Sequence, residues 1–393
     1  MYKINCALSA NREPWNLPLQ ERIRLTQTAQ KEGKRNALLL YTRADTSTFR
    51  YRGYNVMQAT RRSQNWQCVY FFLDELSTLE QLLANADLLI FCRLQWVHAL
   101  AGLKRKAQSL HIPVLFDVDD LVFDLDYLPL VTNTLNVSFS EETDYTYWFS
   151  YISRIGYTAA LADGFFTTND FLGKKLSEKF GKPYQIVRNS LNEEQLAVSA
   201  ECLRRKKMKS SQKPFTLGYF SGTPSHINDF RTIYRELMQF LSDYPDTVLQ
   251  VVGFMEFPPA MQPLIEAKRV TFTPLVDFME LQRLTAQVDV NLVPLVCNTF
   301  TNCKSELKYF EAAVVGTPTV AAPNYTYAHA IQNRKTGFLC QPGQWYDAVR
   351  RLYEHPEEGA AMAEAARNAC LAVYAGDAFT AEVERAYDFF AAP

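Results

Sequence analysis

Residues 288–323 read VDVNLVPLVCNTFTNCKSELKYFEAAVVGTPTVAAP. They predict a buried strand at Val288–Pro294, a helix at Ser305–Val315 and another buried strand at Thr319–Ala322. A polar loop separates the first strand from the helix, and a Gly-Thr-Pro turn follows the helix. A strand, a helix and a second strand in this order form the repeating unit of parallel sheets that are covered by helices. The segment therefore favours an α/β fold.

The same alternation of short apolar runs and longer amphipathic runs extends over the rest of the chain. In the first half it predicts strands at Ala37–Tyr41, Cys68–Phe72, Leu88–Cys92, Pro113–Asp117, Gly164–Thr168 and Tyr184–Val187. In the second half it predicts strands at Phe215–Phe220, Val248–Gly253, Arg269–Thr273, Val288–Pro294, Thr319–Ala322 and Gly337–Cys340. We expect two Rossmann-like, doubly wound domains that face a central cleft, with ligands bound beyond the carboxyl ends of strands.

The length of 393 residues suits two domains. We expect an N-terminal domain at 1–205, a C-terminal domain at 206–375 and a final helix at 376–393 that packs back on the first domain. The basic segment Ala200–Pro214 is interpreted as a solvated linker, or as a surface that rests on anionic lipid headgroups. Further helices are expected at Leu19–Glu32, Val97–Leu110, Phe171–Phe180, Asn228–Ser242, Phe278–Ala286, Tyr346–Tyr353 and Thr380–Phe390.

Composition excludes several classes of protein. Forty-one basic and forty-two acidic side chains give a net charge of −1, which is unlike the positive field of a nucleic-acid-binding protein. Eight cysteines without CxxC spacing and five histidines without an HExxH pair disfavour disulfides and a zinc site, so we expect no metal site. No apolar run resembles a secretory signal or a membrane span. We expect a cytoplasmic protein, attached at most to the inner face of the cytoplasmic membrane.

Charged residues in the second half suggest a nucleotide site. Lys304, Lys308 and Glu311 have i, i+4, i+7 spacing, so we expect all three on one face of the helix that begins near Ser305. Helix N-termini that follow strands bind phosphate oxygens through free backbone N–H groups. Two cations would suit a diphosphate, and a carboxylate would accept the hydroxyls of a ribose. The alternative is a set of Lys–Glu contacts on a solvated helix.

A second loop in the C-terminal half follows the strand LGYFS. Ser221 and Gly222 end this strand, and His226 lies just before the next expected helix. Glycine at this place allows close approach of a ligand to the backbone. His226 is equally suited to a structural hydrogen bond. The absence of a GxGxxG motif disfavours a dinucleotide site.

Carboxylates gather after a strand of the first half, in VLFDVDDLVFD. Asp117, Asp119 and Asp120 stand at or just beyond the end of this strand. Such a cluster can bind sugar hydroxyls, act as a base or bind Mg²⁺, and it can equally cap the following turn. Arg93 and Asn169 also follow strands.

A basic aromatic segment follows the first strand of the chain. In the expected loop Thr42–Asn55, Arg50, Tyr51 and Arg52 combine guanidinium forks with a stacking ring. These groups suit a charged or lipid-linked saccharide acceptor. The alternative is surface basicity.

The segment EAAVVGTPTVAAP at 311–323 resembles the C-terminal signature of GT-B glycosyltransferases of the retaining family 4 type. DVNLVPL, NTFTNCKSELKYFEAA and TGFLC are similar to a subgroup found in bacterial surface-polysaccharide gene clusters, and the resemblance covers most of 214–375. It implies that Glu311 binds the nucleotide ribose. Cys303 stands where the family has a first glutamate, which holds the donor sugar. Glu306 is three residues out of register with that position, and we expect it among the residues that bind the donor.

The resemblance also implies roles for the residues around Glu311. The donor diphosphate would contact the amides of Leu307 and Lys308 beside Ser305, and the first loop of the C-terminal domain with Ser221, Gly222 and His226. Lys304 and Lys308 would supply the counter-charge in place of a metal. Asp119 or Asp120 would take the place of a residue that contacts the donor sugar or the acceptor.

We therefore expect a metal-independent enzyme that moves a sugar, with retention, from a nucleotide-diphosphate donor to a saccharide or lipid-linked saccharide. The C-terminal domain would bind the donor and the N-terminal domain the acceptor, without a further cofactor. The setting would be cell-surface polysaccharide synthesis, as O-antigen or capsule, with peripheral membrane contact as an open question. Two alternatives remain: a catalytically lapsed nucleotide- or glycan-binding module, because Cys303 replaces a carboxylate, and a different reaction on the same fold, such as nucleotide-sugar epimerisation or glycoside phosphorolysis.

Overall fold

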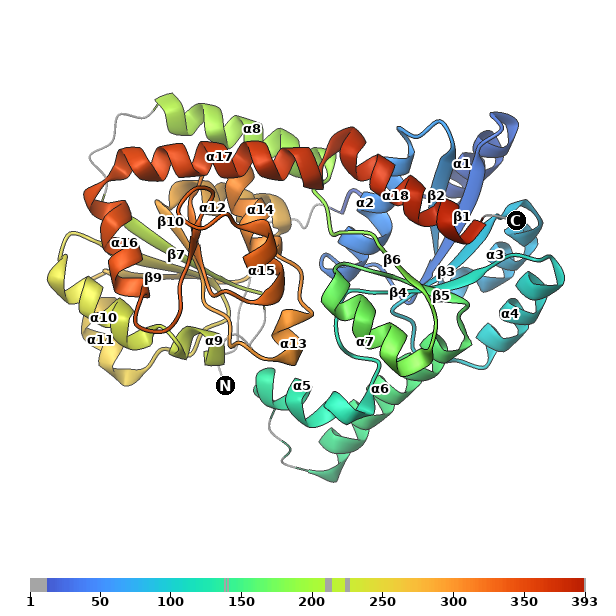
Figure 1. Cartoon of the computed structure of the whole chain (residues 1–393), viewed down its shortest axis with the longest axis horizontal. Helices are drawn as coiled ribbons and strands as arrows, with labels where there is room; N and C mark the ends of the chain where they lie inside the picture. The colour runs from blue at the N-terminus through green and yellow to red at the C-terminus, as the bar shows by residue number, and fades with distance from the viewer. Residues whose placement is uncertain (1–12, 138, 140, 209–213, 223–226, 392–393) are drawn as a thin grey trace.

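The computed structural model describes residues 13–137, 139, 141–208, 214–222 and 227–391. Within these residues the strands form two six-stranded sheets, and every strand pairs in parallel with its neighbours (Figure 1). The first sheet has the order β2-β1-β3-β4-β5-β6 and the second has the order β12-β11-β10-β7-β8-β9. The α/β fold with two doubly wound domains is confirmed.

The strands of the first sheet are β1 (Arg35–Tyr41), β2 (Trp66–Phe72), β3 (Leu88–Cys92), β4 (Val114–Val118), β5 (Gly164–Thr167) and β6 (Tyr184–Ile186). Those of the second sheet are β7 (Thr216–Ser221), β8 (Val248–Gly253), β9 (Val270–Thr273), β10 (Val290–Val293), β11 (Thr319–Ala321) and β12 (Phe338–Leu339). Each coincides with a predicted strand, and the ends differ by two residues at most. Most of these strands are buried, as expected of a parallel sheet that helices cover on both faces.

Each sheet has one point at which the strand order reverses. In the first sheet it lies between β1 and β3, and in the second between β7 and β10. Connections leave these neighbouring strands in opposite directions, and open α/β sheets bind ligands beyond the carboxyl ends of strands at such a point. The loops after these strands are therefore the first place to seek a site.

The helices around the first sheet have defined ends. The helix α7, for example, begins at Asn169, whose side chain accepts a hydrogen bond from the amide of Leu172 at 3.0 Å, and stops at Gly181 with φ of 67°. The full set is α1 (Leu19–Lys31), α2 (Asn55–Thr60), α3 (Leu76–Leu82), α4 (Ala99–Ser109), α5 (Leu128–Thr134), α6 (Glu142–Leu161), α7 (Asp170–Phe180) and α18 (Gly376–Ala391).

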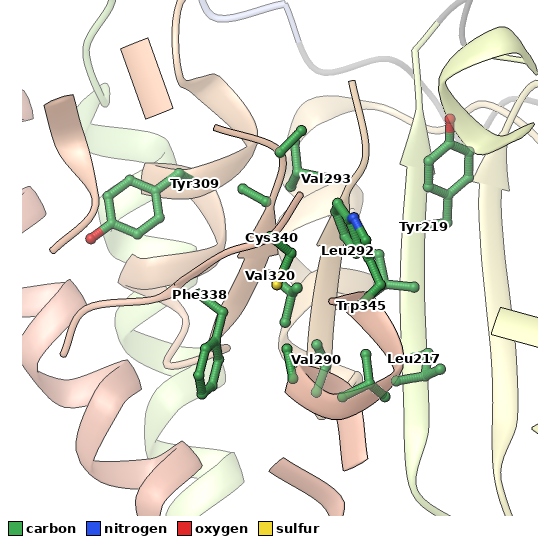
Figure 2. Packing of buried hydrophobic residues seen from close by; sticks show 14 of the residues in the cluster. Leu217, Tyr219, Val290, Leu292, Val293, Tyr309, Val320, Phe338, Cys340 and Trp345 are labelled. Carbon is green, nitrogen blue, oxygen red and sulfur yellow. The ribbon is translucent and has the colours of Figure 1, made fainter. Parts of the chain in front are cut away.

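The helices around the second sheet enclose a core to which the strands contribute Leu217, Tyr219, Val290 and Leu292 (Figure 2). These helices are α8 (Glu193–Met208), α9 (Ile227–Arg231), α10 (Tyr234–Asp243), α11 (Gln262–Glu266), α12 (Phe278–Gln287), α13 (Thr299–Asn302), α14 (Leu307–Val314), α15 (Tyr325–Ala330), α16 (Trp345–Glu354) and α17 (Pro356–Tyr374). The predicted helix Asn228–Ser242 is divided into α9 and α10.

The interpretation of Ala200–Pro214 as a linker is wrong for its first part, because residues 200–208 are the second half of α8. This helix packs against α12, where Gln282 Nε2 donates to Ser199 Oγ at 2.8 Å. Lys206 Nζ donates to the carbonyl oxygen of Gly316 at 2.8 Å. The first part of the basic run therefore lies on a helix that packs against the second domain, with Arg204 and Arg205 exposed and Lys206 in contact with that domain. Residues 209–213 lie outside the described part of the chain.

The C-terminal helices join the two domains. Helix α17 lies along the second domain, and α18 continues onto the first (Figure 1), where Phe379, Val383 and Tyr387 enter its core. The segment between β6 and α8 also passes from one domain to the other. It lies beside the end of α17, because the amide of Leu191 donates to the carbonyl oxygen of Tyr374 at 2.9 Å. The two domains are thus joined by two adjacent stretches of chain. None of the helices described here is long and apolar enough to span a bilayer.

Candidate active site

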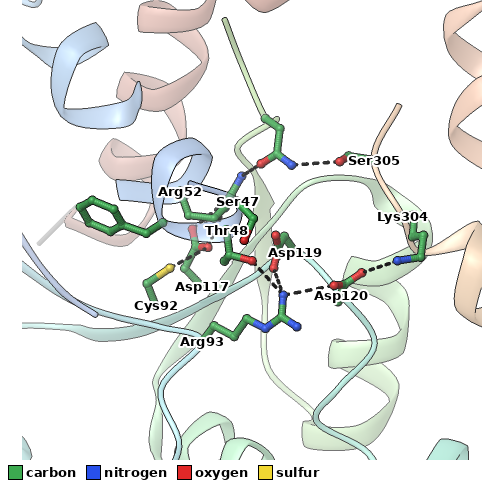
Figure 3. Close-up of polar contacts among 12 residues, drawn as sticks. Ser47, Thr48, Arg52, Cys92, Arg93, Asp117, Asp119, Asp120, Lys304 and Ser305 are labelled. Atoms are coloured by element: carbon green, nitrogen blue, oxygen red, sulfur yellow. Dashed lines mark hydrogen bonds and ion pairs between the residues drawn. The ribbon is translucent and has the colours of Figure 1, made fainter. Parts of the chain in front are cut away.

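Arg93 holds a group of polar side chains together at the carboxyl end of the first sheet. It directly follows β3, with a left-handed φ of 46°, and its amide donates to the carbonyl oxygen of Asp117 on β4 at 2.7 Å. Its guanidinium Nη1 lies 2.8 Å from Asp119 Oδ1, 3.1 Å from Asp120 Oδ2 and 3.0 Å from Thr48 Oγ1 (Figure 3). One cation therefore gathers the loops that follow β1, β3 and β4.

Asp120 connects this group to the second domain. Its Oδ1 lies 3.4 Å from Lys304 Nζ (Figure 3). The ammonium also lies 4.6 Å from the centre of the Phe300 ring. Burial raises the pKa of Asp120, but Lys304 and Arg93 outweigh burial, so the net shift is downward. Burial raises the pKa of Asp119, and the charge of Asp120 adds to that shift while Arg93 opposes it. The two adjacent carboxyls therefore differ in proton affinity.

Lys304 does not share a helix face with Lys308, contrary to the spacing argument. Helix α14 begins at Leu307, two residues later than predicted, and Glu306 before it has non-helical backbone angles of φ −84° and ψ 36°. Lys304 therefore stands on the preceding turn and points to the first domain. Lys308 and Glu311 remain on the helix, three residues apart.

Lys308 is a half-buried cation with no hydrogen bond or ion pair to its ammonium among the described residues. Its Nζ lies 5.8 Å from the centre of the Tyr219 ring on β7. Burial lowers its pKa to about 8; Lys304 contributes to this shift, and Asp229 and Glu311 oppose it. A partly desolvated amine without a carboxylate partner is suited to an anion from outside the chain.

Glu311 lies one turn further along α14 and faces the first domain. Its Oε1 accepts a hydrogen bond from Gln195 Nε2 at 3.0 Å and another from the hydroxyl of Tyr51, and Arg50 Nη2 lies 3.6 Å away. Burial raises the pKa of the Tyr51 hydroxyl well above its usual value, so this hydroxyl stays a donor. Glu311 is therefore held at the contact between the two domains.

The segment predicted to bind the acceptor is not an exposed loop. Residues Arg50–Tyr54 form the π-helical turn η1, and Arg50, Tyr51 and Arg52 are all buried. Tyr51 packs in the core of the second domain. Arg52 meets both carboxylate oxygens of Asp117 at 2.7 Å, and burial of these two charges is possible because each neutralises the other.

A polar chain leads from Arg52 to the second domain. Arg52 Nη1 donates to Asn189 Oδ1 at 3.2 Å, and Asn189 Nδ2 donates to Ser305 Oγ at 2.9 Å (Figure 3). Ser305 therefore lies at the contact between the domains, as Lys304 and Glu311 do. Asn189, Thr48 and Gln195 were not identified from the sequence. The sequence marks Thr48 and Asn189 only by their position, since both follow predicted strands.

The remaining residues of the α14 region are enclosed. Glu306 is buried and accepts a hydrogen bond from the Tyr374 hydroxyl at 2.5 Å, and burial raises its pKa. Cys303 is fully buried in the core of the first domain, and its carbonyl oxygen accepts from Asn169 Nδ2 at 2.8 Å. The side chain at the expected first-glutamate position is therefore enclosed by residues of the first domain. Leu307 is half-buried.

The loop after β7 is described in part. Ser221 ends the strand and is buried, and its carbonyl oxygen accepts from the amide of Phe254 at 3.1 Å. Gly222 is exposed. His226 lies outside the described residues. In the part of the chain that the structure covers, no group of three or more His, Cys, Asp or Glu side chains could hold a metal ion.

Comparison with known proteins supports a class for this fold and site. Residues 215–355 match the family model for glycosyl transferases group 1. No curated protein matches the chain by sequence. Because the match covers the whole second sheet and α14, it includes Lys304, Lys308 and Glu311.

Three solved structures share the two-domain architecture. Anabaena HepE in complex with UDP and glucose is 13% identical, with a TM-score of 0.57 over 89% of this chain and 98% of its own. A glycosyltransferase from Rickettsia africae is 12% identical, with a TM-score of 0.60 over 91% and 98%. Sucrose-phosphate synthase from Thermosynechococcus elongatus is 14% identical, with a TM-score of 0.55 over 92% and 100%. Together with the family match, the GT-B fold supports a glycosyltransferase.

Proposed function

We propose that this chain transfers a sugar from a nucleoside-diphosphate donor to a saccharide hydroxyl with retention, and that α14 binds the donor. The observation that carries the proposal is Lys308 at the first turn of α14, a half-buried cation whose ammonium has no hydrogen bond or ion pair among the described residues. The amides of Leu307 and Lys308 precede the first hydrogen bonds of this helix, so neither has a backbone acceptor among the described residues and both can bind phosphate oxygens. Cation and amides together suit a diphosphate.

Glu311 completes the donor site. It follows Lys308 by one turn, and a carboxylate can accept hydrogen bonds from both hydroxyls of a ribose. Its Oε1 already accepts from Tyr51 and Gln195, so a ribose would share or displace these contacts. The structure of HepE holds UDP and glucose, which supports a nucleotide sugar as the donor.

The chemical step needs stabilisation of the departing diphosphate. Negative charge develops on this group as the sugar–oxygen bond breaks, and Lys308 with the α14 amides would stabilise that charge. An oxygen of the leaving phosphate would accept the proton of the attacking hydroxyl on the same face of the sugar, which gives retention. No further cofactor and no metal are part of this mechanism.

The first domain would position the sugar and the acceptor. Asp119 and Asp120 are held by Arg93 at the carboxyl end of β4, and carboxylates at this place can accept hydrogen bonds from sugar hydroxyls. Lys304 would hold the two domains together at the site, because it pairs with Asp120 across the contact between them. The resemblance to a surface-polysaccharide subgroup points to O-antigen or capsule synthesis in the cytoplasm, with a saccharide or lipid-linked acceptor at the inner membrane face.

The assignment of Glu311 is tested by nucleotide binding. Thermal unfolding with UDP, GDP, ADP and dTDP should single out one nucleotide, because a ligand at 100 times its Kd adds about 2.7 kcal/mol to stability. Glu311→Gln should bind that nucleotide about 10–100-fold more weakly, since a hydrogen bond to a charged group contributes about 1.5–3 kcal/mol.

Tyr51→Phe is the matched control for Glu311→Gln, because it removes the hydroxyl that donates to Glu311 and keeps the carboxylate. It should retain the affinity of the wild type to within about threefold, a difference of under ~0.7 kcal/mol. Equal losses in the two variants would mean that the carboxylate serves the contact between domains and does not bind ribose.

The pH dependence of donor binding follows from Lys308. Its pKa is lowered by burial to about 8, so the ammonium charge is present below that pH and is lost as the pH rises through it. Because a diphosphate favours the charged form, donor affinity should fall above about pH 8, where binding should take up a proton. Calorimetric titrations from about pH 7 to 9, in buffers that differ in ionisation enthalpy, measure both effects. An affinity that stays constant across this range would exclude Lys308 from the site.

A further inference from the structure

An aromatic surface on α6 extends from the candidate site to solvent. The first three turns of this helix carry Tyr145, Tyr147, Trp148, Phe149 and Tyr151, which we call the aromatic arm. Tyr147 is 62% exposed, Phe149 is 45% exposed and Tyr145 is 41% exposed. A concentration of exposed rings on one helix marks an interaction surface more often than chance exposure does.

The two halves of α6 differ in how they pack. In the second half Ile152 and Ile155 are buried, and Gly156 lies so close to the carbonyl oxygen of Phe123 that a Cβ would be 2.3 Å from it. This half fixes the helix to the first domain. Other parts of the chain cover the aromatic half much less. Because aromatic residues have a weak propensity for helix, this half depends on the packed second half to stay helical. Tyr145, Tyr147 and Phe149 of the arm are therefore exposed, whereas Trp148 and Tyr151 are half-buried against the core of the first domain.

The arm is continuous with the site. The hydroxyl of Tyr151 accepts a hydrogen bond from Arg93 Nε at 3.3 Å, and Arg93 also holds Asp119 and Asp120. The ring of Tyr147 is stacked on that of Tyr151, with centroids 6.2 Å apart and planes 12° apart. Tyr151 and Tyr147 thus form a row of two rings from the carboxylates of the first domain to solvent, and Trp148 packs edge-on against both.

The chemistry of the arm favours a neutral polyhydroxylated ligand over a membrane. Three of its five rings are tyrosines, which offer a rigid apolar face and a hydroxyl at low entropic cost. Glu141, Glu142 and Asp144 stand at its N-terminal end, and Arg154 is the one cation of α6. Arg154 is committed to the carbonyl oxygen of Trp96. Anionic lipid surfaces attract clusters of basic residues, and this end of the helix carries the opposite charge.

We propose that the aromatic arm binds the acceptor saccharide beyond the sugar that reacts, with sugar rings stacked on Tyr147 and on the neighbouring rings. The inference rests on the proposed function, because it takes Arg93, Asp119 and Asp120 as the end of the site at which the acceptor hydroxyl arrives. A row of rings that starts at this group gives an extended glycan a path from the reacting hydroxyl to solvent. The arm would then set preference for acceptor length.

The test compares glycan binding by two variants of exposed tyrosines on the same helix. Tyr147→Ala removes the outermost ring of the row, whereas Tyr157→Ala removes a ring that is 54% exposed but packs edge-on against Trp96, away from the arm. The probes are an array of neutral oligosaccharides of two to six sugars, and vesicles of phosphatidylethanolamine and phosphatidylglycerol. The wild type should bind at least one oligosaccharide. Tyr147→Ala should bind it about tenfold more weakly, Tyr157→Ala as tightly as the wild type, and Tyr147→Trp should restore binding.

Each other outcome overturns the proposal. The first is equal affinity for the oligosaccharide in all variants, and the second is an equal loss of that affinity in both alanine variants. The third is a wild type that binds no oligosaccharide. The fourth is vesicle binding or self-association that depends on Tyr147 while glycan binding does not. The proposed function fails separately. If the wild type binds oligosaccharides through Tyr147 but binds none of UDP, GDP, ADP and dTDP, the arm is a glycan site in a protein that is not a nucleotide-sugar transferase.

Discussion

Replacing Lys308 with methionine should lower kcat for sugar transfer by about 10²–10³-fold. The reason is the charge that develops on the leaving diphosphate, since loss of one preorganised donor to such a charge typically costs that much in rate. Methionine fills a similar volume, and it removes a half-buried ammonium that has no partner among the described residues, so the fold should not suffer. Steady-state kinetics with the responding nucleotide sugar measures the effect.

Lys304→Met provides the comparison. Lys304 is paired with Asp120 and lies over the Phe300 ring, so its loss should chiefly weaken contact between the domains and should reduce kcat less than the loss of Lys308. A Lys308→Met enzyme within threefold of the wild-type kcat would exclude Lys308 from stabilisation of the diphosphate. A larger fall in Lys304→Met than in Lys308→Met would assign the role to Lys304.

Replacing Arg52 with methionine should produce the largest loss of stability. Arg52 and Asp117 are both buried, and removal of one partner of a buried ion pair typically costs about 3–5 kcal/mol because the other charge is left uncompensated. For a domain of this size that corresponds to a fall in Tm of about 10 °C. Denaturant titration and thermal unfolding of the variant measure it.

Two further variants show whether the loss of stability comes from the unpaired Asp117 charge or from disruption of the fold by any substitution. The double change Arg52→Met with Asp117→Leu should recover most of the stability, since an apolar pair can replace a buried ion pair at little cost. Arg62→Ala breaks an ion pair to Glu193 that is half exposed on both sides, and should cost no more than about 1 kcal/mol. Equal losses in Arg52→Met and Arg62→Ala would contradict the account of the buried pair.

The strands could be predicted from the sequence because of where they lie. A parallel strand covered by helices on both faces must be apolar at nearly every position, so β3 and β8 stand out as continuous runs with the ends the structure gives them. Right-handed crossovers and short connections restrict the possible strand orders but do not select one, and the order is known from the structure. The switch points near Arg93 and Lys304 are consequences of this order.

The local part of the site could also be predicted, and the part that depends on distant pairing could not. Lys308 and Glu311 are three residues apart, so helical periodicity alone places them near each other. Arg52 and Asp117 are 65 residues apart, and a polar run such as RYRGY is typical of an exposed loop. Burial of Arg52 depends on the ion pair to Asp117 and on two further acceptors at Val187 and Asn189, and no local pattern reports these distant partners.

Two other features depend on tertiary contacts. The turn at Lys304 precedes α14 because Phe300 and Cys303 are drawn into the core of the first domain, whereas helix periodicity would continue through it. Helix α6 was not identified, since rings occur all round its first turns and leave no apolar stripe of helical period. The turn at Lys304 lies where the two domains meet, and the first half of α6 lies at the surface.

The central claim is that the first turn of α14 holds the diphosphate of the donor. A crystal structure of the chain with UDP, or with whichever nucleoside diphosphate stabilises it most, tests this directly. We expect phosphate oxygens within about 3.2 Å of Lys308 Nζ and of the amides of Leu307 and Lys308, with the ribose hydroxyls on Glu311. A diphosphate bound elsewhere, for example beside the arginines of α16, with Lys308 and Glu311 untouched, would contradict the account.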